Sequence, residues 1–159
     1  KAFEYFIDPD DESFATPKNM PEKICAYCEK TGQGKPESDG AMIRCIYESL
    51  ALKYRYAIEQ LSAVTGRAFT TLHVLGGGTK DRLLCQMTAD CCGLTVKAGP
   101  VEATALGNIM IQLKALGLMD SITQGRRLIA ETEVIKTYTP STQNYAEWNA
   151  AYDRFKPLL

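Results

Sequence analysis

The sequence lacks several features on which common functions depend. It contains one histidine in 159 residues, and its formal net charge is −1. It therefore has no excess of positive charge for holding nucleic acid or an anionic membrane surface, and we expect neither as a partner. No apolar run approaches the roughly 18 residues that a membrane span requires. With 45% hydrophobic residues, the chain instead has the composition of one globular domain.

Cysteine is present, but not at the density of a disulfide-stabilised domain. There are six cysteines, and all but one lie in apolar helical patterns. Cys25 and Cys28 have the C-x-x-C spacing of half a zinc site or of a redox pair. A second pair with this spacing is missing, because Cys91 and Cys92 are adjacent and the single histidine, His73, lies in a predicted strand. We interpret the cysteines as small buried side chains, with no metal site and a cytoplasmic location.

The hydrophobic pattern predicts helices that alternate with short strands. Helices are predicted over residues 20–31, 41–65, 79–92, 101–116, 121–130 and 144–155, and strands over 68–75, 94–98 and 133–139. We expect one domain over 1–159, with an irregular opening segment (1–21) and a helical tail (141–159). The outer face of the long helix, with Arg44, Glu48, Lys53, Arg55 and Glu59, is predicted to be solvated, whereas the first strand is predicted to be buried on both faces.

Alternating strands and helices predict a parallel sheet, with ligands bound beyond the carboxyl ends of its strands. Gly76, Gly77 and Gly78 lie at such an end. The surrounding residues match neither the P-loop, which ends in Gly-Lys-Ser/Thr, nor the G-x-G-x-x-G dinucleotide motif. A tight turn explains one or two glycines, and three in a row favour a nucleotide or phosphate that approaches the backbone closely.

Two long stretches resemble a known family. "GGGTKDRLLCQMTADCCGLTVKAGPVEATALGNIMIQLKALG" (76–117) is similar to the C-terminal domain of the FGGY carbohydrate kinases. "MPEKICAYCEKTGQGKPESDGAMIRCIYESLALKYR" (20–55) resembles the branch of that family that phosphorylates L-rhamnulose. The resemblance extends over about residues 3–140.

The resemblance implies an α/β fold of the actin-like, ribonuclease H-like ATPase type. This chain would be part of the C-terminal, ATP-side domain, helix-rich with a short parallel sheet. Because it begins with Lys1, we expect a piece of a longer protein, without the first domain and the opening strands of the second. The uncovered sheet edge would favour self-association. The implied reaction transfers the γ-phosphoryl group of ATP, with Mg²⁺, to L-rhamnulose and gives L-rhamnulose 1-phosphate and ADP.

The resemblance also implies roles for particular residues. The backbone of Gly77 would contact the nucleotide, with Gly76 and Gly78 beside it. The family usually has asparagine, facing the adenine, where this chain has Asp81, which accepts hydrogen bonds but does not donate them. Asp81 has an equally good alternative role in stabilising the start of the following helix. The aspartate base would lie upstream of Lys1, so this chain would hold no catalytic residue and no metal ligand.

A pair of cysteines belongs to the same resemblance. Sequences of the L-rhamnulose branch tend to carry cysteine at the positions of Cys28 and Cys45. The two residues lie at facing ends of consecutive predicted helices, so their Cα atoms can approach to the roughly 4.4–6.8 Å of a disulfide. We expect them to be spatial neighbours that bond on oxidation in vitro and stay reduced in the cytoplasm.

Two further readings of the function remain open. The chain could belong to a kinase for another ketose, such as fuculose or xylulose, because most of the sugar pocket would lie outside it. It could also belong to a non-catalytic module that senses nucleotides on the same fold.

Overall fold

The computed structural model describes every residue from Lys1 to Leu159. The helices are α1 (Met20–Lys30), α2 (Asp39–Thr65), α3 (Arg82–Cys92), α4 (Ala103–Ala115), α5 (Ile122–Thr132) and α6 (Tyr145–Phe155). The strands are β1 (Thr71–Val74), β2 (Thr95–Ala98) and β3 (Lys136–Tyr138), and short 3₁₀ turns cover Glu12–Phe14, Gly77–Lys80 and Lys156–Leu158. None of the helices combines the length and the hydropathy needed to cross a membrane.

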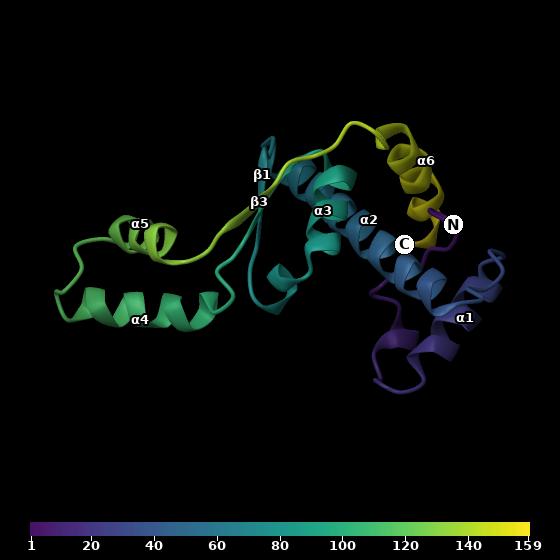
Figure 1. Cartoon of the computed structure of the whole chain (residues 1–159), viewed down its shortest axis with the longest axis horizontal. Coiled ribbons are helices and arrows are strands. Elements are labelled where there is room, and N and C mark those ends of the chain that lie inside the picture. Colours follow the sequence, from purple (N-terminus) through teal and green to yellow (C-terminus); the bar gives the residue numbers. More distant parts are fainter.

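Helix α2 forms the central axis of the helical half of the molecule (Figure 1). Ser38 begins it, because its hydroxyl accepts a hydrogen bond from the backbone N–H of Ala41 at 3.2 Å. Gly66 ends it in the left-handed conformation, with φ of 66°. Helices α1, α3 and α6 gather around α2, whereas α4 and α5 project away from it as a separate hairpin (Figure 1).

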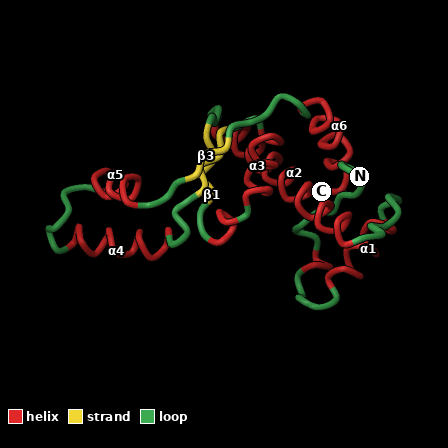
Figure 2. The backbone as a smooth tube through the Cα atoms, in the orientation of Figure 1, coloured by secondary structure: helices red, strands yellow, loops and turns green.

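The three strands form a mixed sheet in the order β1-β2-β3 (Figure 2). Strand β2 is parallel to β1, with Leu72 opposite Val96, and antiparallel to β3, with Val96 opposite Tyr138. The prediction of a parallel sheet was therefore right for β1 and β2 and wrong for β3. The physical reason is the α4–α5 hairpin, which carries the chain out from β2 and back again, so that β3 runs in the reverse direction.

Only one face of the sheet is covered. On that face, helix α3 packs through Cys85 and Ala89 against Val96 and Ala98, with Leu72, Val74 and Tyr138 beside them. On the opposite face His73, Lys97 and Thr137 are exposed. The expectation that β1 is buried on both faces was wrong, because β1 is an edge strand with one open face, and His73 lies on that face.

The largest core cluster joins α2, α3 and α6. Its buried members are Phe6, Ala51, Leu52, Met87, Cys91, Trp148, Ala151, Tyr152 and Phe155. The aromatic side chains of α6 contribute three of these residues, while Tyr145 at the start of the helix is 52% exposed. The buried aromatic side chains of α6 therefore pack the end of the chain against α2 and α3.

Residues 3–7 form an irregular segment that crosses α2. Its backbone N–H groups donate to side-chain oxygens of Glu48, Gln33 and Ser49 at 2.8, 2.8 and 2.9 Å. Arg154 of α6 holds the same segment by donating to two of its carbonyl oxygens, at 2.8 and 3.1 Å. The segment buries Glu48, which is only 1% exposed, so the prediction of a solvated position for this residue was wrong.

Burial raises the pKa of Glu48 to about 7, opposed by the hydrogen bond from Phe3 and by Arg44, which lies 3.2 Å away. Because the pKa of the folded state lies above that of the unfolded chain, the stabilising contribution is complete below about pH 4.5 and is lost as the pH rises through about 7. This pH dependence of stability is opposite to that of a carboxylate whose pKa is lowered on folding.

We therefore predict that wild-type protein loses stability relative to Glu48→Gln as the pH rises. The difference in unfolding free energy between the two proteins should change by about 3 kcal/mol between about pH 5 and about pH 8. Urea denaturation across this range measures it, with Glu131→Gln as a control because Glu131 is exposed. A difference that is constant with pH would contradict the assignment.

Candidate nucleotide site

The three glycines form the turn between β1 and α3. Gly76 has φ of 80° and ψ of −159°, a conformation that L side chains rarely adopt. The buried Thr79 closes the turn, because its hydroxyl donates to the carbonyl oxygen of Gly76 at 2.7 Å. The N–H of Gly76 donates to the carbonyl oxygen of Pro100 at 3.3 Å, which ties the turn to the loop after β2.

Gly77 and Gly78 differ from Gly76 in what the fold requires of them. Neither has a positive φ, and both lie in the 3₁₀ turn. A Cβ atom built on either residue meets no atom of the chain within 4 Å. The chain's own geometry therefore requires glycine at Gly76 only. The open space above the other two glycines is where a ligand can approach the bare backbone.

Asp81 joins the turn to two helices. Its Oδ1 accepts the N–H of Leu84 at 3.0 Å and so caps α3, and its Oδ2 accepts the phenol O–H of Tyr47 from α2. The backbone N–H of Asp81 donates to the carbonyl oxygen of Gly78 at 3.2 Å. The hydrogen bond from Leu84, followed by that from Tyr47, lowers the pKa of the Asp81 carboxyl, so it is ionised at neutral pH. The helix-start role foreseen for Asp81 is thus present in the structure.

Tyr47 is the residue of this site that the sequence pattern did not single out. Its helical spacing placed it among the inward-facing residues of the long helix, and it does pack against the main core cluster. Its hydrogen bond to a residue 34 positions away depends on how α2 and α3 cross. No signal in the sequence distinguishes Tyr47 from the other core positions of α2, because only the fold brings it to Asp81.

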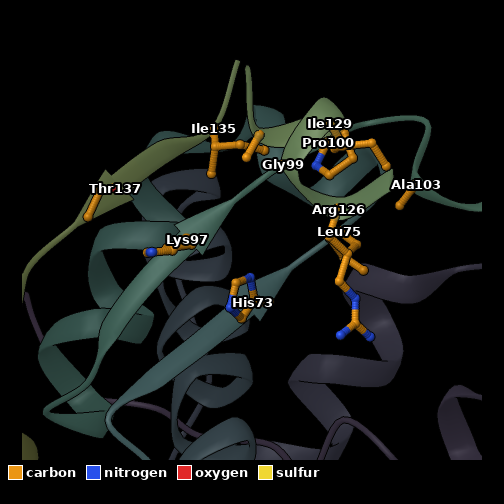
Figure 3. A pocket seen from close by; sticks show the side chains of 11 residues that line it. His73, Leu75, Lys97, Gly99, Pro100, Ala103, Arg126, Ile129, Ile135 and Thr137 are labelled. Carbon is orange, nitrogen blue, oxygen red and sulfur yellow. The ribbon is translucent and has the colours of Figure 1, made fainter. Parts of the chain in front are cut away.

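An open pocket of about 690 Å³ adjoins the turn on the uncovered face of the sheet. Figure 3 shows His73 and Lys97 on neighbouring strands, and Leu75, which precedes the glycines, at the same opening. Arg126 reaches the pocket from α5. The lining contains Lys97, Arg126 and His73 and no carboxylate, so the pocket favours an anionic group, whereas the turn itself carries the ionised carboxylate of Asp81.

Cys28 and Cys45 lie together in a second buried cluster with Ile7, Ile24 and Tyr27. The interaction of the two thiols lowers the pKa of Cys28 and, together with burial, raises that of Cys45. All six cysteines are free thiols. No group of three or more histidine, cysteine, aspartate or glutamate side chains is placed to hold a metal ion.

A comparison of the sequence with models of known protein families identifies the family of this chain. Residues 1–116 match the model of the C-terminal domain of the FGGY family of carbohydrate kinases. This match includes the glycine turn, α3 and β2, and the chain belongs to this family.

Two curated relatives are similar to this chain over almost its whole length. The chain is 48% identical over 154 residues to a rhamnulokinase of Bacteroides thetaiotaomicron, and this alignment covers 97% of the chain and 31% of the relative. It is 40% identical to a rhamnulokinase of an Enterobacter species, over 96% of the chain and 32% of the relative. The chain thus spans about a third of the length of these relatives.

A solved structure supports the fold. The crystal structure of xylulose kinase from Rhodospirillum rubrum superposes with a TM-score of 0.58 at 22% identity. The superposition covers 77% of this chain and 24% of that protein. At this level of identity the likeness concerns the fold, which is the α/β architecture of an FGGY kinase C-terminal domain with a small mixed sheet.

The contact between two thiols leads to a prediction about oxidation. A mild oxidant should link Cys28 to Cys45, and slowly, because both side chains are at most 1% exposed and must await local opening. Peptide mass mapping without reductant detects the link. Cys45→Ala should abolish it and Cys92→Ala should not. A bond between Cys25 and Cys28 in the wild-type protein would show that the predicted pairing is wrong.

Proposed function

We propose that this chain is the nucleotide-binding part of a kinase that transfers the γ-phosphoryl group of ATP to L-rhamnulose, giving L-rhamnulose 1-phosphate and ADP. In this proposal, the backbone of Gly77 and Gly78 forms one wall of the ATP site. Gly76 shapes the turn, and Asp81 lies at the adenine end. A cytoplasmic location, expected from the cysteine usage, is part of the same proposal.

The observation that carries the proposal is the open space above two glycines that the fold does not itself require. A Cβ on Gly77 or Gly78 would meet nothing in this chain, and neither backbone conformation demands glycine. Gly40 and Gly107 have these properties too, but each stands alone in a helix, whereas two such glycines side by side after a strand favour a ligand that approaches the backbone. Its position beyond the carboxyl end of β1 is the usual place for a ligand in an open α/β sheet.

The relatives support the choice of sugar. Both curated relatives are rhamnulokinases, at 48% and 40% identity over nearly the whole chain. Mg²⁺ would supply charge neutralisation on the phosphates. No cluster of acidic or other ligating side chains in this chain is arranged to hold the ion. We therefore place the metal ligands and the base outside these residues, and give this chain the tasks of binding and orienting the nucleotide.

The glycine turn provides a test within the full-length polypeptide that carries this chain. Gly77→Val should weaken ATP binding about tenfold or more, because the isopropyl group occupies nucleotide volume. The fold should persist, because the added Cβ meets no atom of the chain within 4 Å. Calorimetric titration with ATP measures the affinity, and thermal unfolding checks the fold.

Gly40→Val is the matched control for this substitution. Gly40 also has no positive φ and no atom within 4 Å of an added Cβ, but it lies in the first turn of α2. Its replacement should leave ATP affinity unchanged. If Gly77→Val binds ATP as tightly as Gly40→Val does, the turn is not part of the nucleotide site.

The chain by itself should not catalyse phosphoryl transfer, because a base, an aligned acceptor hydroxyl and metal-bound phosphates must act together. Incubation with ATP, Mg²⁺ and L-rhamnulose should yield no ADP above background. The full-length polypeptide should form ADP with L-rhamnulose in preference to L-fuculose and D-xylulose. Sugar-dependent ADP from the isolated chain would place a base within these residues.

Self-association of the isolated chain belongs to the same proposal. β1 pairs with β2 on one side only, so its outer edge has unpaired backbone groups. The α4–α5 hairpin exposes further apolar side chains, including Ile109, Ile111, Leu116, Leu118 and Leu128. In the full-length protein we expect the preceding part of the polypeptide to cover this edge and this hairpin.

A further inference from the structure

We propose that residues 3–7 act as a strap over the thiols of Cys28 and Cys45, and that the strap opens locally when Glu48 loses its proton. The two thiols then form a site of covalent modification that is closed at acidic pH and accessible to small reagents above neutral pH. The inference concerns residues outside the glycine turn and does not depend on the proposed nucleotide site.

The strap is the movable part of the cover over the two thiols. Cys28 and Cys45 are at most 1% exposed, in a buried cluster with Ile7 of the strap. The carbonyl oxygen of Phe6 lies 4.0 Å from the sulfur of Cys28. The other buried members of the cluster lie on α1 and α2, so the strap can move away while both helices stay folded.

Side chains of α2, of α6 and of the loop after α1 hold the strap by hydrogen bonds to its backbone. The N–H groups of the strap donate to Glu48, Gln33 and Ser49, and Arg154 donates to two of its carbonyl oxygens. Glutamine and serine side chains do not ionise near neutral pH, and arginine stays protonated in proteins. Among these partners, Glu48 is therefore the one whose charge changes.

The ionised form of Glu48 is poorly stabilised while the strap is closed. Its Oε2 accepts the N–H of Phe3 at 2.8 Å, but its buried Oε1 accepts no hydrogen bond from the chain. The ion-pair partner of Oε1 is Arg44, whose Nε lies 3.2 Å away and whose side chain is 37% exposed, so solvent weakens the pair. Opening of the strap hydrates the carboxylate and removes this unfavourable burial.

The charged and titratable groups around Glu48 come from α2, α6 and the strap. They are Arg44 and Cys45 of α2, Arg154 of α6, and the amino end of the chain with Lys1 and Glu4. Burial has the largest effect and raises the pKa of Glu48 to about 7, although the hydrogen bond from Phe3, Arg44 and the amino end all oppose it. The surrounding charges therefore do not compensate for burial.

Opening of the strap should become easier as the pH rises. In the closed strap the pKa of Glu48 is about 7, whereas in the open strap it returns towards its ordinary value of 4.5. Closure is thus fully favoured below about pH 4.5 and is weakened as the pH rises through about 7. With these two values, the open fraction increases about tenfold between about pH 6 and about pH 8.

Thiol labelling of the full-length polypeptide measures this opening. The probe is N-ethylmaleimide, to which the S–H adds across the carbon–carbon double bond with no leaving group, and peptide mass mapping gives the rate at Cys28. The ratio of the rates in wild-type protein and Glu48→Gln should rise about tenfold between about pH 6 and about pH 8, because the ratio cancels the effect of pH on the thiol itself. The ratio of wild-type protein to Glu131→Gln should stay constant, because Glu131 is exposed on α5.

The alternative is that reagents reach the two thiols only when the whole domain unfolds. Cys85 separates the two routes, because it is also 1% exposed but lies in the cluster between α3 and the sheet. Local opening predicts labelling about tenfold or more faster at Cys28 than at Cys85. Equal rates at the two cysteines would overturn the inference.

Gln33→Ala tests the cover without changing a charge. Gln33 exchanges two hydrogen bonds with the backbone of Phe6, each of 2.8 Å. Their loss should accelerate labelling of Cys28 about tenfold and leave Cys85 unaffected. A ratio of wild-type protein to Glu48→Gln that stays constant with pH contradicts the inference. If Glu48→Gln does not fold, an unchanged rate at Cys28 in Gln33→Ala overturns it by itself.

Discussion

The carboxylate of Asp81 is the contact on which the arrangement of this site depends. It caps α3 through Leu84 and accepts the phenol of Tyr47 from α2, while its backbone is bound to the glycine turn. Because the turn, the helix that follows it and the central helix meet at one ionised group, the turn cannot move independently of the core. A backbone wall for a ligand needs this rigidity, since bare glycines have no side chains to hold their own position.

The turn and the pocket near it contain few chemically reactive groups. The turn presents N–H groups and open space but no catalytic group, and the adjoining pocket offers basic side chains without a carboxylate. An FGGY carbohydrate kinase needs both a nucleotide and a sugar held in line, and this chain spans about a third of its curated relatives. The uncovered face of the sheet and the apolar side chains of the projecting hairpin are exposed in this chain.

Most elements could be predicted from the sequence because each depends on local periodicity and local signals. Ser38 and Gly66 delimit α2, and the strand after Gly93 lies where its apolar run predicts. The direction of β3 could not be predicted, because it depends on the α4–α5 hairpin, which turns the chain back. Glu48 looked solvated on a helical wheel, yet residues 3–7 cover it, and no periodicity reveals a segment that crosses a helix from 45 residues away.

The candidate site, too, could be predicted from the sequence only in part. The run of glycines marked the turn, and its resemblance to FGGY kinases gave it a role. Which of the three glycines the fold requires for itself was visible only from φ and from the space around each Cα. The partner of Asp81 was hidden in the same way, because Tyr47 has the spacing of an ordinary core residue.

The measurement that tests the central claim most directly is hydrogen exchange of the full-length polypeptide with and without a non-hydrolysable ATP analogue. If the glycine turn is a wall of the nucleotide site, the amides of residues 76–81 should be protected when the analogue binds. Those at the start of α6, on the far side of α3, should be unaffected. Binding of the analogue with unchanged exchange across the turn would contradict the account.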